Sequence, residues 1–82
     1  MRIGLFAADT VGHEIVSFFN EAREPFACLI LDSMDGKGLN SSMRRIAVEA
    51  LCPLVLTSDI LKESRGISTL RDLELDLLIL AW

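Results

Sequence analysis

The sequence predicts an α/β protein with a Rossmann-like parallel sheet of about four strands, in the spatial order 3-2-1-4, flanked by helices. Short apolar runs alternate with stretches of helical periodicity along the whole chain. The run "FACLILD" lacks the polar alternation of a half-exposed strand, which is typical of a strand covered on both faces of its sheet. Alternating strands and helices favour parallel pairing with right-handed crossovers, so we expect one domain over residues 1–82.

The first strand and the first helix follow each other directly. "RIGLFAA" is an apolar run of strand length, and the next residues place apolar side chains at helical spacing: Val11, Ile15, Phe18, Phe19 and Ala22. Asp9 or Thr10 is expected to cap this helix, because a short side-chain oxygen accepts a hydrogen bond from the first turn's unpaired N–H groups. Pro25 disfavours helix at Glu24 and so ends it.

The remaining elements repeat this alternation. After "FACLILD" and the loop "DSMDGKG", Asn40 or Ser41 is expected to cap a second helix, whose apolar face is Met43, Ile46, Ala47, Ala50 and Leu51. "LVL" forms a short third strand, and "SDILKES" and "STLRDLE" form two brief helical turns interrupted by Gly66. The fourth strand is "DLLILAW", from Asp76 to Trp82.

Composition argues against several classes of partner. Hydrophobic residues make up 51% of the chain, yet no apolar run approaches the roughly 20 residues that span a bilayer, so we expect no membrane partner. The net charge is -4 and Lys and Arg are scattered, so we expect no autonomous nucleic-acid binding. Cys28 and Cys52 are too few and too far apart for a zinc site or a disulfide framework, and we expect no metal. Reduced core cysteines indicate a cytoplasmic protein.

The turn "AADTVGHE" is the best candidate for a binding site. A doubly wound fold binds phosphate at its first strand-to-helix turn, because N–H groups converge there. Of the G-x-G-x-x-G fingerprint only Gly12 is present, and Asp9 places a negative charge at the mouth, so a dinucleotide is not favoured. We expect Asp9, Thr10, Val11 and Gly12 to bind an anion or an acceptor substrate weakly.

Other polar residues are open to two interpretations each. Asp32, after the second strand, is either a loop-capping acid or a ribose ligand. His13 is either a solvent-facing helix residue or a general base, and the sequence places no nucleophile at motif spacing from it. "SMDGKGLN", with Gly36, Lys37 and Gly38, lacks the spacing of a P-loop, so a surface loop is favoured over an anion site.

The succession "MRIGLFAADTVGHEIVSFF", "FACLILD", "PLVLTSDI" and "DLELDLLILAW" resembles the N-terminal half of the folate-dependent formyltransferases, the family of methionyl-tRNA formyltransferase and the sugar-nucleotide N-formyltransferases. The resemblance spans the whole chain and implies a fold that is incomplete relative to the full family fold. It also implies a full-length parent that transfers a formyl group from 10-formyltetrahydrofolate to a primary amine. The family's Asn-x-His pair and later Asp would follow Trp82, so no catalytic residue is expected and the chain alone should be inert.

The same resemblance suggests where ligands would lie. It implies that the acceptor approaches the turn from Asp9 to Gly12 and that the folate pocket begins near Ala81 and Trp82. Because the sequence ends inside an apolar strand, we expect an N-terminal fragment whose exposed edge, Asp76 to Trp82, joins a second copy as a homodimer. The alternative, from a different class, is a stand-alone small α/β binding or interaction module.

Overall fold

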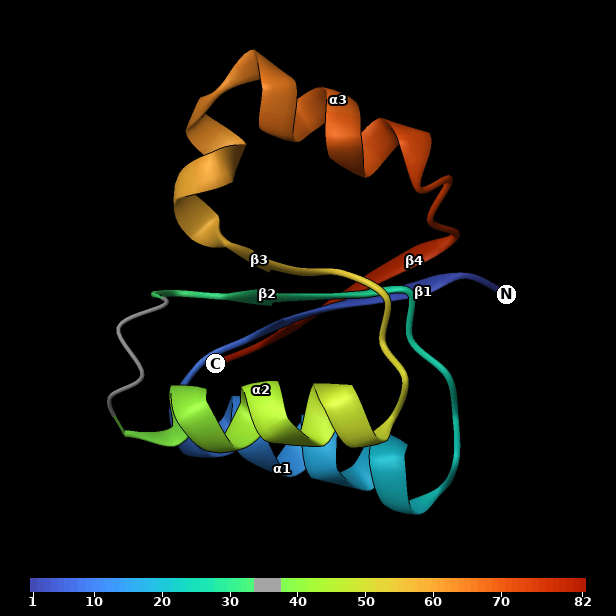
Figure 1. Cartoon of the computed structure of the whole chain (residues 1–82), viewed down its shortest axis with the longest axis vertical. Coiled ribbons are helices and arrows are strands. Elements are labelled where there is room, and N and C mark those ends of the chain that lie inside the picture. The colour runs from blue at the N-terminus through green and yellow to red at the C-terminus, as the bar shows by residue number, and fades with distance from the viewer. Residues whose placement is uncertain (34–37) are drawn as a thin grey trace.

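The computed structural model describes residues 1–33 and 38–82 and has the predicted α/β fold. Four parallel strands pair in the order β3-β2-β1-β4, which confirms the predicted fold class. In Figure 1, α1 and α2 lie together on one face of the sheet, and η1 and α3 lie on the other. The elements are β1 (Ile3–Ala7), α1 (Asp9–Glu21), β2 (Cys28–Leu31), α2 (Leu39–Glu49), β3 (Val55–Thr57), the 3-10 helix η1 (Ser58–Lys62), α3 (Ser64–Asp72) and β4 (Leu77–Ala81).

The main core lies between the sheet and the pair α1 and α2. Alternate strand residues point into it, and they meet the inner faces of both helices; its buried members are Leu5, Ala7, Val16, Phe26, Leu29, Leu31, Met43 and Ala47. All four residues of β2 are buried. The prediction that "FACLILD" holds a strand covered on both faces is therefore confirmed.

The buried face of α1 differs from the predicted stripe. Gly12 and Val16 are its buried residues, whereas Phe18 is 62% exposed and Val11 is also exposed. The helix packs so closely on β1 that the position in contact with the strand must be a glycine. A pattern of large apolar residues does not identify such a position. Leu51 likewise was placed on the core face of α2, but it follows the helix and is 86% exposed.

The predicted helix caps are wrong. The residue before α1 is Ala8, which makes no side-chain cap bond, and Asp9 is the first helical residue, with a φ of 55°. The chain turns into the helix directly from β1, and the Ala8 amide donates to the Ala81 carbonyl. Neither Asn40 nor Ser41 caps α2: Gly38 precedes the helix with a φ of 57°, a conformation that glycine adopts readily.

Among the described residues, all three α-helices end through a residue other than glycine in the left-handed region. These residues are Arg23, Leu51 and Glu74, with φ values of 56°, 58° and 52°. The next amides close the ends of α1 and α2: Glu24 N–H donates to the Phe19 carbonyl and Cys52 N–H donates to the Ala47 carbonyl, both at 2.9 Å. This is the Schellman pattern, in which glycine is the usual residue because a Cβ is strained there.

We expect Leu51→Gly to stabilise the domain by about 1 kcal/mol, because it removes the strained Cβ, offset by the entropy of a more flexible unfolded chain. The melting temperature should rise by about 4–8 °C in thermal denaturation. Val48→Gly is the matched control, since Val48 is exposed inside α2 and the same change there should cost about 0.5 kcal/mol. If both variants lost stability, the left-handed turn at Leu51 would be wrong.

Helix α3 differs from the prediction in its boundaries. It runs through Gly66, which is buried, and the break in the helical segment lies instead at Glu63, between η1 and α3. α3 packs chiefly against η1, and over β4 the sheet stays open: Leu78 and Leu80 are exposed, the latter by 59%.

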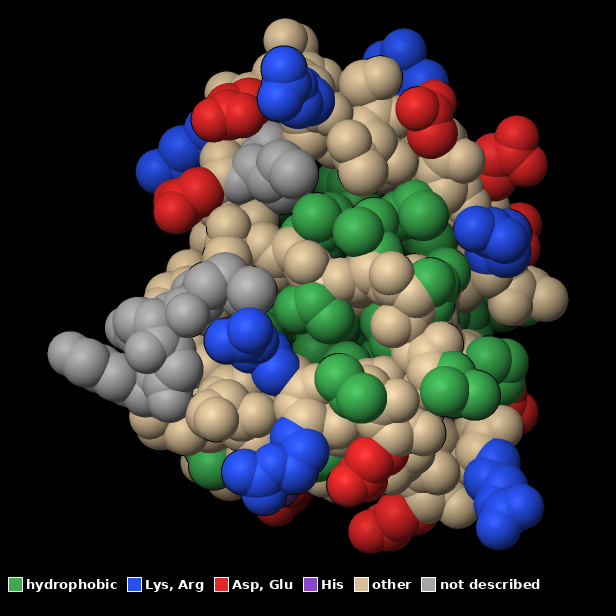
Figure 2. All heavy atoms as spheres, viewed as in Figure 1, with side chains coloured by type: hydrophobic (Ala, Val, Ile, Leu, Met, Phe, Trp, Pro, Cys, Tyr) green, Lys and Arg blue, Asp and Glu red, His purple; other side chains and the backbone are tan. Residues whose placement is uncertain are grey.

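The opposite edge of the sheet, at β3, is better covered. Its three residues, Val55–Thr57, are half-buried and lead straight into η1. Figure 2 shows hydrophobic side chains gathered between α3 and α2 on this side of the molecule. Among the described residues, no helix has the length and hydropathy that crossing a bilayer requires.

Candidate functional site at the carboxyl edge of the sheet

The order β3-β2-β1-β4 creates a switch point between β1 and β4. From β1 the chain adds β2 and β3 on one side, and then it crosses back to add β4 on the other side of β1. α1 and α3 therefore lie on opposite faces, and ligands of open α/β sheets bind in the crevice beyond the strand ends at such a point. The Ala8 N–H donates to the Ala81 carbonyl at 2.9 Å and joins the two strand ends. The structure thus brings together both predicted site segments, Asp9 to Gly12 and Ala81 to Trp82.

The turn from Asp9 to Gly12 presents backbone donors to solvent. Asp9, Thr10 and Val11 are exposed, and the Gly12 amide is the first to bond within the helix, to the Ala8 carbonyl at 2.9 Å. The amides of residues 9–11 therefore have no partner inside α1, as is general for a first helical turn. The predicted anion site would therefore depend on these three amides and not on the Gly12 amide, which is already bonded.

Gly12 has a structural role instead. A Cβ at this position would lie 2.8 Å from the carbonyl carbon and the Cβ of Ala7, closer than real Cβ atoms come. Gly12 therefore lets α1 approach β1, which is the packing role of the last glycine in dinucleotide-binding turns. It is buried, so only its neighbours can contact a ligand.

Trp82 adds an aromatic surface beside the same crevice. Its ring packs edge-on against Phe6, with ring centroids 5.1 Å apart, and it remains 63% exposed. Phe6 alternates with the core residues Leu5 and Ala7, so this aromatic pair lies on the face of the sheet opposite α1. The turn of α1 and the Trp82 ring therefore flank the strand ends from the two faces.

The polar residues at the end of β2 hold the start of α2 in place. Asn40 is buried, and its Nδ2 donates to Asp32 Oδ1 at 2.9 Å and to the Ser33 carbonyl at 3.1 Å. Ser58 Oγ donates to the Asp32 carbonyl at 3.4 Å. Of the two roles open to Asp32, the loop-capping one is therefore supported. Of the loop "SMDGKGLN", Gly36 and Lys37 lie outside the described residues.

His13 is not the solvent-facing residue that one interpretation expected. It is half-buried, and its Nε2 lies 2.9 Å from Ser42 Oγ, which ties α1 to α2. The partner is 29 residues away in sequence, so no motif spacing could have revealed it. The bond links two helices at their N-terminal halves, on the side of α1 away from β4.

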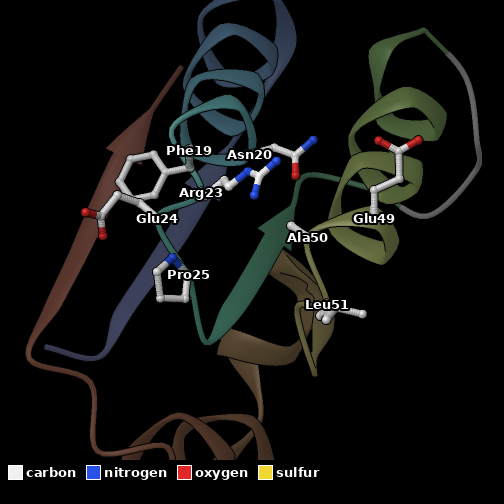
Figure 3. Close-up of a pocket in the computed structure, with 8 residues that line it drawn as sticks. All are labelled: Phe19, Asn20, Arg23, Glu24, Pro25, Glu49, Ala50 and Leu51. Carbon is white, nitrogen blue, oxygen red and sulfur yellow. The ribbon is translucent and has the colours of Figure 1, made fainter.

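A hollow also lies far from this edge. It measures about 410 Å³ and opens between the C-terminal ends of α1 and α2, at the amino edge of the sheet; its lining is Phe19, Asn20, Arg23, Glu24, Pro25, Glu49, Ala50 and Leu51. Figure 3 shows Asn20 and Arg23 on one side and Glu49 across from them. The charged side chains are exposed, so solvent and salt weaken their pull on a ligand. The sequence did not predict this hollow, and it contains none of the predicted site residues.

The two cysteines offer no nucleophile. Both are free, and burial raises the pKa of the Cys28 thiol to about 11, with the nearby Cys52 adding to the effect. Burial also raises the pKa of Cys52. Both thiols stay protonated near neutral pH, and a protonated thiol is a poor nucleophile.

Neither a metal centre nor a known relative identifies the site. Within residues 1–33 and 38–82, no three His, Cys, Asp or Glu side chains group as a metal site requires. Compared with known protein families, with curated proteins and with solved structures, the chain matches none.

Proposed function

We propose that this chain is the N-terminal part of a formyltransferase-like protein. Its full-length form would transfer a formyl group from 10-formyltetrahydrofolate to a primary amine, carried by methionyl-tRNA or by an amino sugar nucleotide. The observation that supports this best is the hydrogen bond from Ala8 to Ala81, because it joins the first turn and the end of β4 at a switch point. These are the two segments that the family resemblance implies for acceptor and folate.

The chemistry of the turn suits an acceptor that carries both a phosphate and an amine. The amides of residues 9–11, which have no partner inside α1, and the N-terminus of α1 favour an anion such as the acceptor's phosphate. The Asp9 carboxylate, exposed beside them, favours an ammonium group and disfavours a second phosphate. A flat ring of the folate would lie against Trp82, next to Ala81. The 82 residues supply binding and orientation only, so the chain alone is inert.

Location and assembly complete the proposal. Two free thiols favour a reducing compartment, so we place the protein in the cytoplasm. We place two copies together as a homodimer through the segment from Asp76 to Trp82. β4 is an edge strand with exposed leucines, and such an edge pairs readily with another strand.

The proposed function is tested with the chain, 10-formyltetrahydrofolate and each of the two acceptors. No formylated product is expected, because the resemblance places the groups that would deprotonate the amine and stabilise the developing oxyanion after Trp82. In a titration with inorganic phosphate followed by amide chemical shifts, the amides of Asp9 to Gly12 should move first. Thr10→Pro should weaken these shifts, since proline removes one donor and is tolerated in a first helical turn.

Three outcomes would contradict the proposal. Formyl transfer that disappears in His13→Gln would make His13 a base and the chain an enzyme on its own. Phosphate shifts centred on Gly38 would place the anion site at α2 instead. A stop codon directly after Trp82, in place of a reading frame that encodes Asn-x-His, would favour the stand-alone binding or interaction module.

A further inference from the structure

The exposed apolar surface of β4 continues onto α1. Successive residues of a helix are rotated by about 100°. Gly12 and Val16 face the sheet, and His13 faces α2 through its bond to Ser42. Val11, Ile15 and Phe18 are rotated from Gly12 and Val16 in the direction opposite to His13. They therefore lie on the flank of α1 that faces away from α2, above β4.

We call this combined surface the β4 seam; its members are Val11, Ile15 and Phe18 of α1 with Leu77, Leu78, Ile79 and Leu80 of β4. None of these side chains is charged, and all except Ile15 and Ile79 are exposed. A contiguous apolar surface rimmed by polar residues marks an interaction site. Asp76 at its end is already engaged, since its Oδ2 accepts the Arg2 backbone N–H at 2.7 Å.

We propose that a second copy of this chain covers both layers of the β4 seam, strand and helix, around a two-fold axis through Ile79. This rests on the proposed association through β4 and extends it to α1. The two β4 strands run antiparallel and join the two sheets into one. The α1 helices of the two copies lie side by side across the axis.

The strand layer matches itself under this symmetry. Leu78 meets Leu80 on the open face of the sheet, and Ile79 meets Ile79 of the second copy on the α1 face, so large apolar side chains pair on both faces. On the α1 face, Leu77 meets the smaller Ala81. No charged side chain faces another within β4, from Leu77 to Ala81, and a self-complementary patch is what an isologous interface requires.

The helix layer follows from the same axis. α1 carries the chain from the carboxyl edge back to the amino edge, so Phe18 lies towards the start of β4 and Val11 towards its end. The axis therefore brings Phe18 and Leu77 of one copy against Val11 and Ala81 of the other. Ala81 leaves room for the Phe18 ring, and Phe18 is 62% exposed in the single chain.

The other edge of the sheet fits a second copy less well. β3 is three residues long and half-buried, whereas β4 is five residues long. β3 therefore offers fewer backbone hydrogen bonds to a second copy. Arg44 and Arg45 of α2 line the same shallow hollow as Val55. Two copies joined at β3 would bring these like charges together, which disfavours pairing.

Sedimentation velocity at micromolar concentration tests the proposal. The natural chain should sediment as a dimer, and Phe18→Asp should raise the dimer dissociation constant by at least about tenfold, because a buried aromatic is replaced by a charge. Val48→Asp is the matched control: Val48 is more exposed than Phe18 and lies on α2, so the dimer should persist. Circular dichroism confirms that each variant is folded.

Cross-linking tests the register. Ile79→Cys should form a disulfide between two copies under mild oxidation, because the side chain meets itself at the axis, whereas Leu77→Cys should not. A monodisperse monomer would overturn both the homodimer and the seam. A dimer that is broken by Ile79→Lys but unaffected by Phe18→Asp would keep pairing through β4 and overturn the helix layer alone.

Discussion

Gly12→Ala is expected to destabilise the domain by about 2–3 kcal/mol in urea denaturation, although alanine is the better helix former by about 1 kcal/mol. The new Cβ would sit 2.8 Å from the carbonyl carbon of Ala7, in the backbone of a central strand that cannot move aside cheaply. Overpacking therefore outweighs propensity. The loss is a large share of the roughly 5–15 kcal/mol that holds a typical domain together.

The control for this prediction is Glu14→Ala, two residues further along the same helix. Glu14 is exposed, so the change should stay within about 0.5 kcal/mol of the natural chain. If Gly12→Ala were as stable as the natural chain, or more so, helix propensity would dominate at this position. The close approach of α1 to β1 would then be wrong, and Gly12 would be free to serve a ligand.

The packing role of Gly12 could not be predicted from the sequence. The sequence predicts Gly12 as part of a weak anion or acceptor site, whereas the structure shows that Gly12 lets a helix pack closely on a strand. Periodicity counts large apolar residues, so it favoured Val11 and Phe18 as core and gave no weight to a glycine. Leu51 was misplaced for a related reason: its apolar side chain fitted the pattern, but the chain had already left the helix.

The carboxyl-edge site was predictable because it depends on topology alone. Parallel strands end at one edge, so Asp9 and Trp82 had to lie near the same crevice once the order of strands was predicted. The ties from Asn40 to Asp32 and from His13 to Ser42 depend on side chains of different elements, which periodicity does not encode. Periodicity also does not encode the hollow at the amino edge, because that hollow is formed jointly by the ends of α1 and α2.

Ile30→Ala should cost about 2–5 kcal/mol, whereas Leu80→Ala should cost less than about 1 kcal/mol in the monomer. Both residues are neighbours of Phe6 in the sheet, on the face that η1 and α3 approach. Ile30 is 0% exposed and Leu80 is 59% exposed, so only the first change leaves a cavity.

Urea denaturation below the dimer dissociation constant measures both variants, because association would otherwise add to the apparent stability of the natural chain. The contrast follows from how α3 is held: it packs chiefly on η1, near the β3 end of the sheet, and leaves β4 uncovered. Equal losses at Ile30 and Leu80 would mean that α3 covers the whole face in solution. The open strand would then be closed within one chain, and a second copy would have no apolar face at β4 to bury.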